Sequence, residues 1–159
     1  MYGLDQGIRE REIYTQIDKN LAVKIDSIHF VNLFEIIEKY GYPSKNLLGE
    51  ANFEQQCVGG ASQVILLHNP YRLLSDRRKI KMLVKEADKG NLNREFIATV
   101  LDKHFWWKSG GKEVLYGSAF GMPCFSSKAT TNILRKEIGL SPLEDSLFID
   151  CSKNNFLNE

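Results

Sequence analysis

The stretch Asp26–Pro43 reads DSIHFVNLFEIIEKYGYP, and it decides the fold class of this chain. Asp26 or Ser27 is a typical helix N-cap, and Gly41 is a typical stop before Pro43, which cannot continue a helix. Most positions between them are apolar, at helical spacing. These positions are Ile28, Val31, Leu33, Phe34, Ile36, Ile37 and Tyr40. The stretch therefore predicts a helix that is buried over most of its surface.

Further helices are expected on both sides of this stretch. Their approximate ranges are 5–23, 52–68, 75–89, 94–107 and 128–138. Gly59 and Gly60 should each weaken the helix over 52–68 by roughly 1 kcal/mol, a cost that is usually tolerated where another backbone approaches closely. Two short extended segments around Gly117 and Gly121 predict a small β-hairpin.

The expected fold class is mainly α, with a single compact helical domain of about six helices and one small β-hairpin. Residues 1–24 are expected to form a charged N-terminal helix, residues 25–146 the domain, and residues 147–159 a C-terminal tail. A length of 159 residues fits one domain of ordinary size. At this length the core needs neither a metal nor a disulfide to complete it.

Composition narrows the class of protein. The hydrophobic content of 43% and the charged content of 26% are those of a soluble globular protein. The net charge of +1 argues against nucleic acid as a partner, and the basic cluster at residues 72–81 is interpreted as a solvated face. The sequence contains no apolar run of membrane-spanning length.

The expected compartment depends on how the chain begins. The first residues are charged and lack the apolar core of a signal peptide, so the chain as written is expected in the cytoplasm. A periplasmic or cell-surface location would follow if a leader has been removed. The three cysteines lie far apart in the sequence, which favours a core position for Cys57. For Cys124 and Cys151, buried thiols are favoured over a disulfide.

Polar groups inside or beside apolar segments mark a candidate site, because burying such a group costs free energy unless it has a partner. If the protein is an enzyme, the predicted catalytic residues are His68 as general base, Asp102 as its orienting carboxylate, and Tyr116 as acid or oxyanion donor. The residues predicted to bind a ligand or partner are Asp26, His29, Lys103, Trp106, Trp107 and Gly117.

Several of these residues could instead have a purely structural role. His68 could instead cap a helix C-terminus, where the helix dipole favours a cation. The aromatic run before Lys108 is more often core than a stacking platform. A metal site built from Asp26, His29, His68 and His104 would lack a recognised ligand spacing, so neither a metal nor a cofactor is predicted.

The motifs, taken in order, resemble a bacterial domain-of-unknown-function family. Its members read Asp-x-x-Asn-x-x-x-Leu-x-x-Ile-Ile, then Gly-Trp-Pro and Val-Gly, then Gln-His, Asp-Arg, Gln-x-Tyr-Gly-Thr and Gly-Leu-x-Pro-Leu. The corresponding positions here are Asp26-x-x-His29, Tyr40–Pro43, Leu48-Gly49, His68, Asp102, Tyr116-Gly117 and Gly139–Leu143. The resemblance covers about residues 26–143 and implies the fold and the position of a site, not a reaction.

This chain departs from the family pattern at several polar positions. His29 replaces the family's Asn, Leu67 its Gln, Lys103 its Arg, Val114 its Gln and Ser118 its Thr. Lysine lacks the bidentate fork with which arginine holds a carboxylate or phosphate.

The pattern of kept and altered positions predicts a non-catalytic binding or protein-interaction module. By analogy such a module would act in toxin–immunity or cell-surface systems, with a protein or a small ligand as its partner. The alternative is a hydrolase or transferase that uses His68, Asp102 and Tyr116.

Overall fold

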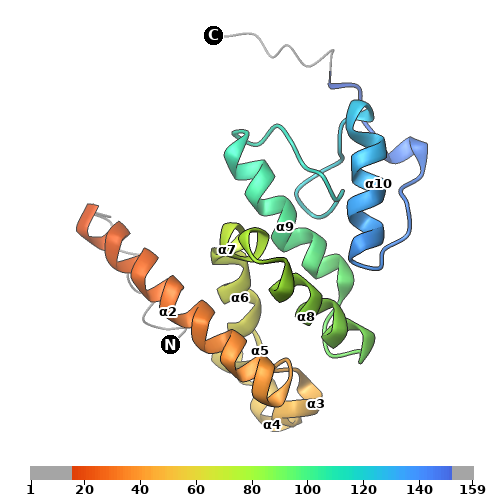
Figure 1. Cartoon of the computed structure of the whole chain (residues 1–159). Helices are drawn as coiled ribbons and strands as arrows, with labels where there is room; N and C mark the ends of the chain where they lie inside the picture. Colours follow the sequence, from red (N-terminus) through yellow and green to blue (C-terminus); the bar gives the residue numbers. More distant parts are fainter. Residues whose placement is uncertain (1–15, 152–159) are drawn as a thin grey trace. The chain divides into compact units, whose positions relative to one another are not determined.

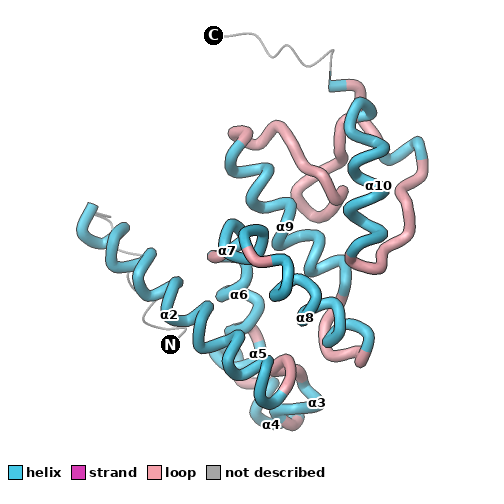
Figure 2. Tube along the Cα trace, in the orientation of Figure 1, coloured by secondary structure: helices cyan, strands magenta, loops and turns pink. Residues whose placement is uncertain are grey.

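The computed structural model describes residues 16–151, and helices dominate it (Figures 1 and 2). The mainly α prediction is therefore confirmed. The chain divides into two compact units, one ending at Leu92 and the other beginning at Asn93. This boundary falls inside the range 25–146 that was expected to form one domain, at a turn that follows Gly90.

The first unit is built on one long helix, α2 (Gln16–Tyr40). Short helices follow it: α3 (Lys45–Leu48), α4 (Glu50–Phe53), α5 (Gln56–Gly59), α6 (Ala61–His68), α7 (Pro70–Ser75) and α8 (Arg77–Asp88). Helices α6 and α8 both contact α2 (Figure 1). The core includes Phe30, Leu33 and Ile37 of α2, Leu66 of α6 and Leu83 of α8.

Two predictions for this unit are wrong. Helix α2 continues through Asp26 and Ser27, because a capping residue without a glycine or proline beside it does not end a helix. The part of the expected first helix before residue 16 lies outside the described residues. The expected helix over 52–68 is broken between α4 and α6, and a Cβ on Gly59 would overlap the Phe53 carbonyl oxygen. Glycine is therefore required where the chain folds back on itself.

Buried Glu86 closes the turn after α2. Its Oε2 accepts the Tyr42 backbone N–H at 2.9 Å and the Asn91 side-chain amide at 2.9 Å, and its Oε1 accepts Lys89 Nζ at 2.6 Å. Burial alone would raise the pKa of Glu86, but these hydrogen bonds outweigh it and the pKa is lowered. The Tyr42 hydroxyl in turn accepts a hydrogen bond from Ser62 at 2.9 Å. The Gly41–Pro43 motif is thereby fixed to α8 and α6.

The second unit contains α9 (Arg94–Lys108) and α10 (Lys128–Glu137), with 3₁₀ helices η1 (Phe125–Ser127) and η2 (Asp145–Leu147). The expected β-hairpin is not present among the described residues, which hold only the isolated bridges Ser118–Gly121 and Cys124–Ile149. The physical reason lies in the hydrogen bonds. The backbone donors of Leu115 and Tyr116 go to a side chain of α9 instead of a second strand.

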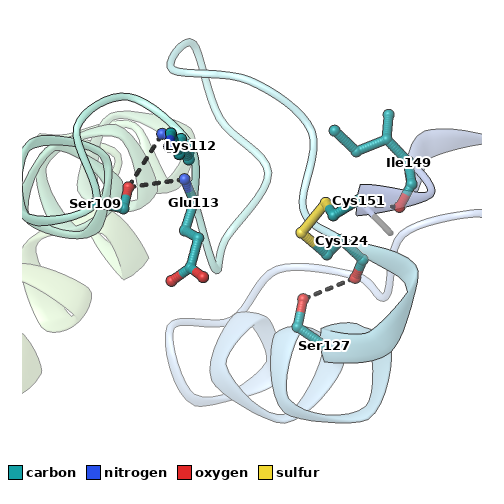
Figure 3. The surroundings of a disulfide bond; sticks show 7 residues. All are labelled: Ser109, Lys112, Glu113, Cys124, Ser127, Ile149 and Cys151. Carbon is teal, nitrogen blue, oxygen red and sulfur yellow. Dashed lines mark hydrogen bonds between the residues drawn. A yellow bond between two sulfur atoms is a disulfide. The ribbon is translucent and has the colours of Figure 1, made fainter. Parts of the chain in front are cut away.

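A disulfide between Cys124 and Cys151 joins residues 27 apart in the sequence (Figure 3). Around it, the Phe125 N–H donates to the Ile149 carbonyl at 2.8 Å, and the Ile149 N–H donates to the Pro123 carbonyl at 3.0 Å. Residues 147–151 of the expected tail are therefore part of the second unit and are held against its 123–125 backbone. Residues 152–159 lie outside the described residues.

The favoured cysteine assignments are corrected by these contacts. Cys124 and Cys151 are bonded to each other, so they are not buried thiols. Cys57 is an exposed free cysteine, not a core residue, because the expected helix over 52–68 is broken and Cys57 lies on the short helix α5, separate from α6.

None of the described helices combines the length and the apolar composition that crossing a membrane requires.

Candidate functional site

His68 is paired with a carboxylate in the first unit. It is the last residue of α6, and its Nδ1 lies 3.3 Å from Asp26 Oδ1 on α2. The next residue, buried Asn69, donates its side-chain amide to the carbonyl oxygens of Asp26 at 3.2 Å and Ile65 at 2.9 Å. His29 follows Asp26 by one turn of α2 and is half-buried. The arrangement joins the end of α6 to the middle of α2.

Asp102 lies fully buried on α9 in the second unit, where its Oδ1 accepts the backbone N–H groups of Leu115 and Tyr116, both at 2.7 Å. Burial raises the pKa of Asp102, and the two N–H donors oppose that effect. Tyr116 is also buried. Gly117 has a positive φ, and a Cβ there would lie 2.5 Å from Leu143 Cδ1. Asp102 therefore fixes a tight loop whose glycine cannot be replaced without movement.

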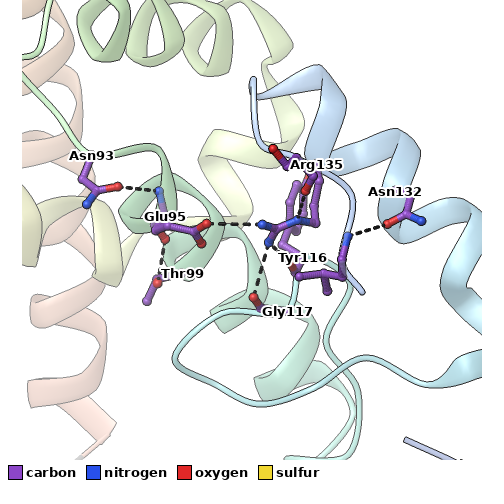
Figure 4. Close-up of polar contacts among 9 residues, drawn as sticks. Asn93, Glu95, Thr99, Tyr116, Gly117, Asn132 and Arg135 are labelled. Atoms are coloured by element: carbon purple, nitrogen blue, oxygen red, sulfur yellow. Dashed lines mark hydrogen bonds and ion pairs between the residues drawn. The ribbon is translucent and has the colours of Figure 1, made fainter. Parts of the chain in front are cut away.

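Sequence reasoning missed Arg135, the buried arginine of α10 that holds the other side of this loop (Figure 4). Its NH1 donates to the Tyr116 carbonyl at 2.6 Å, its Nε to the Ser141 carbonyl at 2.8 Å, and its NH2 to Glu95 Oε1 at 3.2 Å. The sequence offers only a partial signal, because Arg135 lies three residues before apolar Ile138 and so on the same side of its helix.

The residues predicted for catalysis are divided between the two units. His68 belongs to the first unit, whereas Asp102 and Tyr116 belong to the second. Within the first unit, Asp26 is the carboxylate that lies beside His68. In the second unit, Asp102 and Tyr116 meet through the Tyr116 backbone.

The remaining predicted binding residues lie on α9. Trp106 packs against Phe120 with ring centroids 5.3 Å apart, whereas Trp107 is 78% exposed. Lys103, one turn before Trp107, is half-buried. A shallow hollow of about 430 Å³ lies at this end of the helix, and Phe105, Lys108, Ser109, Lys112 and Glu113 line it.

One face of α2 exposes apolar side chains, contrary to the expectation of a mostly buried helix. Leu21, Ile28 and Val31 are 45%, 59% and 49% exposed, and they lie on the side opposite Phe30 and Leu33. Beside this face, α2 and the start of α8 enclose a groove of about 300 Å³. Its lining residues are Val31, Phe34, Glu35, Glu38, Asp76, Arg78, Lys79 and Met82.

The charges of this groove are organised by Asp76, which caps α8. Its carboxylate accepts the Arg78 backbone N–H and the Arg78 guanidinium, each at 3.1 Å, and Lys79 Nζ at 3.0 Å. The Arg78 guanidinium and the Lys79 ammonium hold the pKa of Asp76 well below its usual range. Lys79 also lies over the Phe34 ring, 5.3 Å from its centroid. The groove therefore presents cationic and apolar groups together, opposite the carboxylates of Glu35 and Glu38.

Comparison of the chain with protein-family models, with curated proteins and with solved structures finds no match.

Proposed function

We propose that this protein is a non-catalytic protein-interaction module, and that the exposed face of α2 with its adjoining groove is the binding surface. The observation that carries the proposal is the exposure of Leu21, Ile28 and Val31 on one face of a helix whose opposite face is buried. Exposed apolar side chains that share one face of a helix are typical of a contact site.

The hydrogen bonds made by Asp102 and Tyr116 support a non-catalytic role. The Asp102 carboxylate receives two backbone N–H groups, and the Tyr116 carbonyl receives the Arg135 guanidinium. These groups are used to hold a loop in place. Both donors bind Oδ1 of the buried Asp102, so this oxygen satisfies the loop backbone.

The charges beside the exposed face favour a protein partner over a nucleic acid. Arg78 and Lys79 line the groove with Glu35 and Glu38, and Lys24 lies on the exposed face of α2 by helical periodicity. A phosphate backbone would be repelled by the carboxylates, whereas a protein surface can match both signs.

The proposal is tested by placing aspartates on the exposed face. Ile28→Asp with Val31→Asp should reduce recovery of the partner from extracts of the source cells by at least about tenfold, because burying an unpaired charge at an interface is costly. Ile133→Asp is the matched control, since Ile133 is also exposed and apolar but lies on α10. Equal recovery by the parent and both variants, with unchanged helical circular dichroism, would contradict the proposal.

A second candidate function rests on the Asp26–His68 pair. In a hydrolase or transferase His68 would be the base, and its position beside Asp26 gives Asp26, in place of Asp102, the orienting role. Purified protein would then turn over activated esters, and His68→Gln would abolish that turnover. Equal rates for the two proteins would remove this candidate.

We further propose an oxidising compartment, which is the periplasmic or cell-surface alternative. The Cys124–Cys151 disulfide supports it, because such bonds persist outside the reducing cytoplasm. Protein taken from the source cells with its thiols blocked on lysis should carry the blocking group on Cys57 and not on Cys124 or Cys151. Blocked Cys124 and Cys151 would indicate a reducing compartment.

A further inference from the structure

The residues on the exposed face of α2, called the seam below, have the spacing of a coiled-coil interface. Its residues recur at intervals of three and four, which is the heptad pattern of helices that pack side by side. They are Leu21, Lys24, Ile28, Val31, Glu35 and Glu38, and all of them are exposed. Within the first unit α6 and α8 contact α2 (Figure 1). By helical periodicity these six residues lie on the side of α2 opposite its buried residues. A second helix could therefore lie along this face.

The order of charges on the seam is self-complementary. A two-fold axis passing between His29 and Phe30 turns the helix end over end and sets Ile28 opposite Val31 of a second copy. The same operation sets Lys24 opposite Glu35 of that copy, and Glu35 opposite its Lys24. Leu21 then meets the aliphatic part of Glu38 at each end. The apolar pair is thus flanked on both sides by opposite charges.

We propose that the occupant of this face is a second copy of the chain, with the two α2 helices antiparallel and Lys24 of each paired with Glu35 of the other. The inference rests on the proposed function, since it names the partner of the same surface. A two-fold interface of this kind uses one patch on both copies, which is the commonest symmetry of homodimers.

Glu35 lines the groove with Arg78 and Lys79, but both of these cations bind the carboxylate of Asp76. Lys24 and Glu35 are separated by about 16 Å along the helix axis, so they cannot pair within one chain. Among residues 16–151, neither forms an ion pair within 4.0 Å. A parallel arrangement would set Lys24 against Lys24 and Glu35 against Glu35, which is repulsive. The antiparallel register is therefore the one that matches charge as well as shape.

A single helix pair buries less than the standard interface of about 1,600 Å², so the expected dimer is reversible and concentration-dependent. The experiment is sedimentation velocity on the full chain from about 1 µM to about 500 µM. A Cys57→Ser background removes the exposed thiol, which could otherwise form an intermolecular disulfide.

Charge-reversal variants test whether the two α2 helices pair in the antiparallel orientation. Lys24→Glu alone and Glu35→Lys alone should each weaken dimerisation by about tenfold or more, because each sets like charges opposite one another. The double variant Lys24→Glu/Glu35→Lys should restore dimerisation to within about threefold of the parent, since the antiparallel pairs reform with their signs exchanged. Lys81→Glu, on an exposed position of α8, is the control and should leave the dimer unchanged.

Two results would overturn the inference. One is a chain that stays monomeric at every concentration, and the other is a double variant that remains as weak as the single ones. Neither result decides the proposed function, because recovery of a partner by the Ile28→Asp/Val31→Asp variant is a separate measurement on the same face. Loss of that recovery by a monomeric protein would assign the face to a different protein partner.

Discussion

Asp102 illustrates, at the scale of a single residue, why a buried carboxylate does not by itself mark a catalyst. Its position inside an apolar segment predicts that it has partners, and those partners turn out to be two backbone N–H groups of a tight loop. The sequence could indicate that Asp102 is buried and therefore needs hydrogen-bond partners. It could not indicate whether the partner is a histidine, a ligand or the backbone, because the loop shape depends on Gly117 and Leu143 together.

The raised pKa of Asp102 gives a testable pH dependence. A carboxyl group with a higher pKa in the folded state binds its proton more tightly there, so its contribution to stability falls as pH rises through that folded-state pKa. Asp102→Asn removes this titration and keeps an oxygen acceptor for the N–H groups. The free energy of unfolding of the parent relative to Asp102→Asn should therefore decrease as pH rises from about 4 towards neutrality.

Urea unfolding of both proteins across this pH range measures the difference. Asp145→Asn is a control, since Asp145 is an exposed acid of the same unit with one lysine partner. A relative stability that instead increases with pH would contradict the raised pKa.

At the scale of elements, α2 shows which features of a helix the sequence predicts and which it does not. The stop at Gly41 and Pro43 was predictable, because glycine and proline act on the local backbone wherever they occur. The uninterrupted course through Asp26 and Ser27 was not, since capping residues are tolerated inside helices. The exposed face was not predictable either. Apolar residues surround the helix on all sides, and only the positions of α6 and α8 decide which of them are covered.

The second unit has an element-scale prediction of its own. The Arg135 guanidinium on α10 donates to the backbone carbonyl oxygens of residues 116, 117 and 141 and to the carboxylate of Glu95 on α9. Arg135→Lys should lower the free energy of unfolding by about 2–4 kcal/mol, because lysine cannot reach these acceptors together. Hydrogen exchange should become faster in residues 115–118 and 139–143. Lys136→Arg, an exposed neighbour, should change neither quantity.

Unchanged exchange in both segments for Arg135→Lys would show that the guanidinium does not hold the loop. A uniform increase across the whole chain would point to general instability in place of a local role.

At the scale of the whole molecule, the disulfide is the feature that the spacing of the cysteines in the sequence could not predict. Cys124 and Cys151 are paired because residues 147–151 return to the 123–125 backbone, and this return depends on Phe148 being buried. In the loop-entropy model, closing a loop of this length contributes about 3.5 kcal/mol. Cys124→Ser/Cys151→Ser should therefore destabilise the second unit by about that amount.

Hydrogen exchange resolves the two units and checks this prediction. Residues 93–151 should lose protection in the double serine variant, whereas residues 16–92 should retain it, because the contact pattern divides the chain between Leu92 and Asn93. Equal loss of protection in both ranges would show that the chain unfolds as a single unit. A native, unreduced sample should also show one reactive thiol, that of exposed Cys57.

The central claim is that the exposed face of α2 pairs two copies of this protein through opposite charges. Its most direct test mixes the two single charge-reversal variants, Lys24→Glu and Glu35→Lys, at a concentration at which each alone sediments as a monomer and the parent as a dimer. In the mixed pair, positions 24 and 35 are both acidic in the first variant and both basic in the second. Each antiparallel contact then joins opposite charges, so the mixture should sediment as a one-to-one dimer. A mixture in which both variants remain monomeric would contradict the claim.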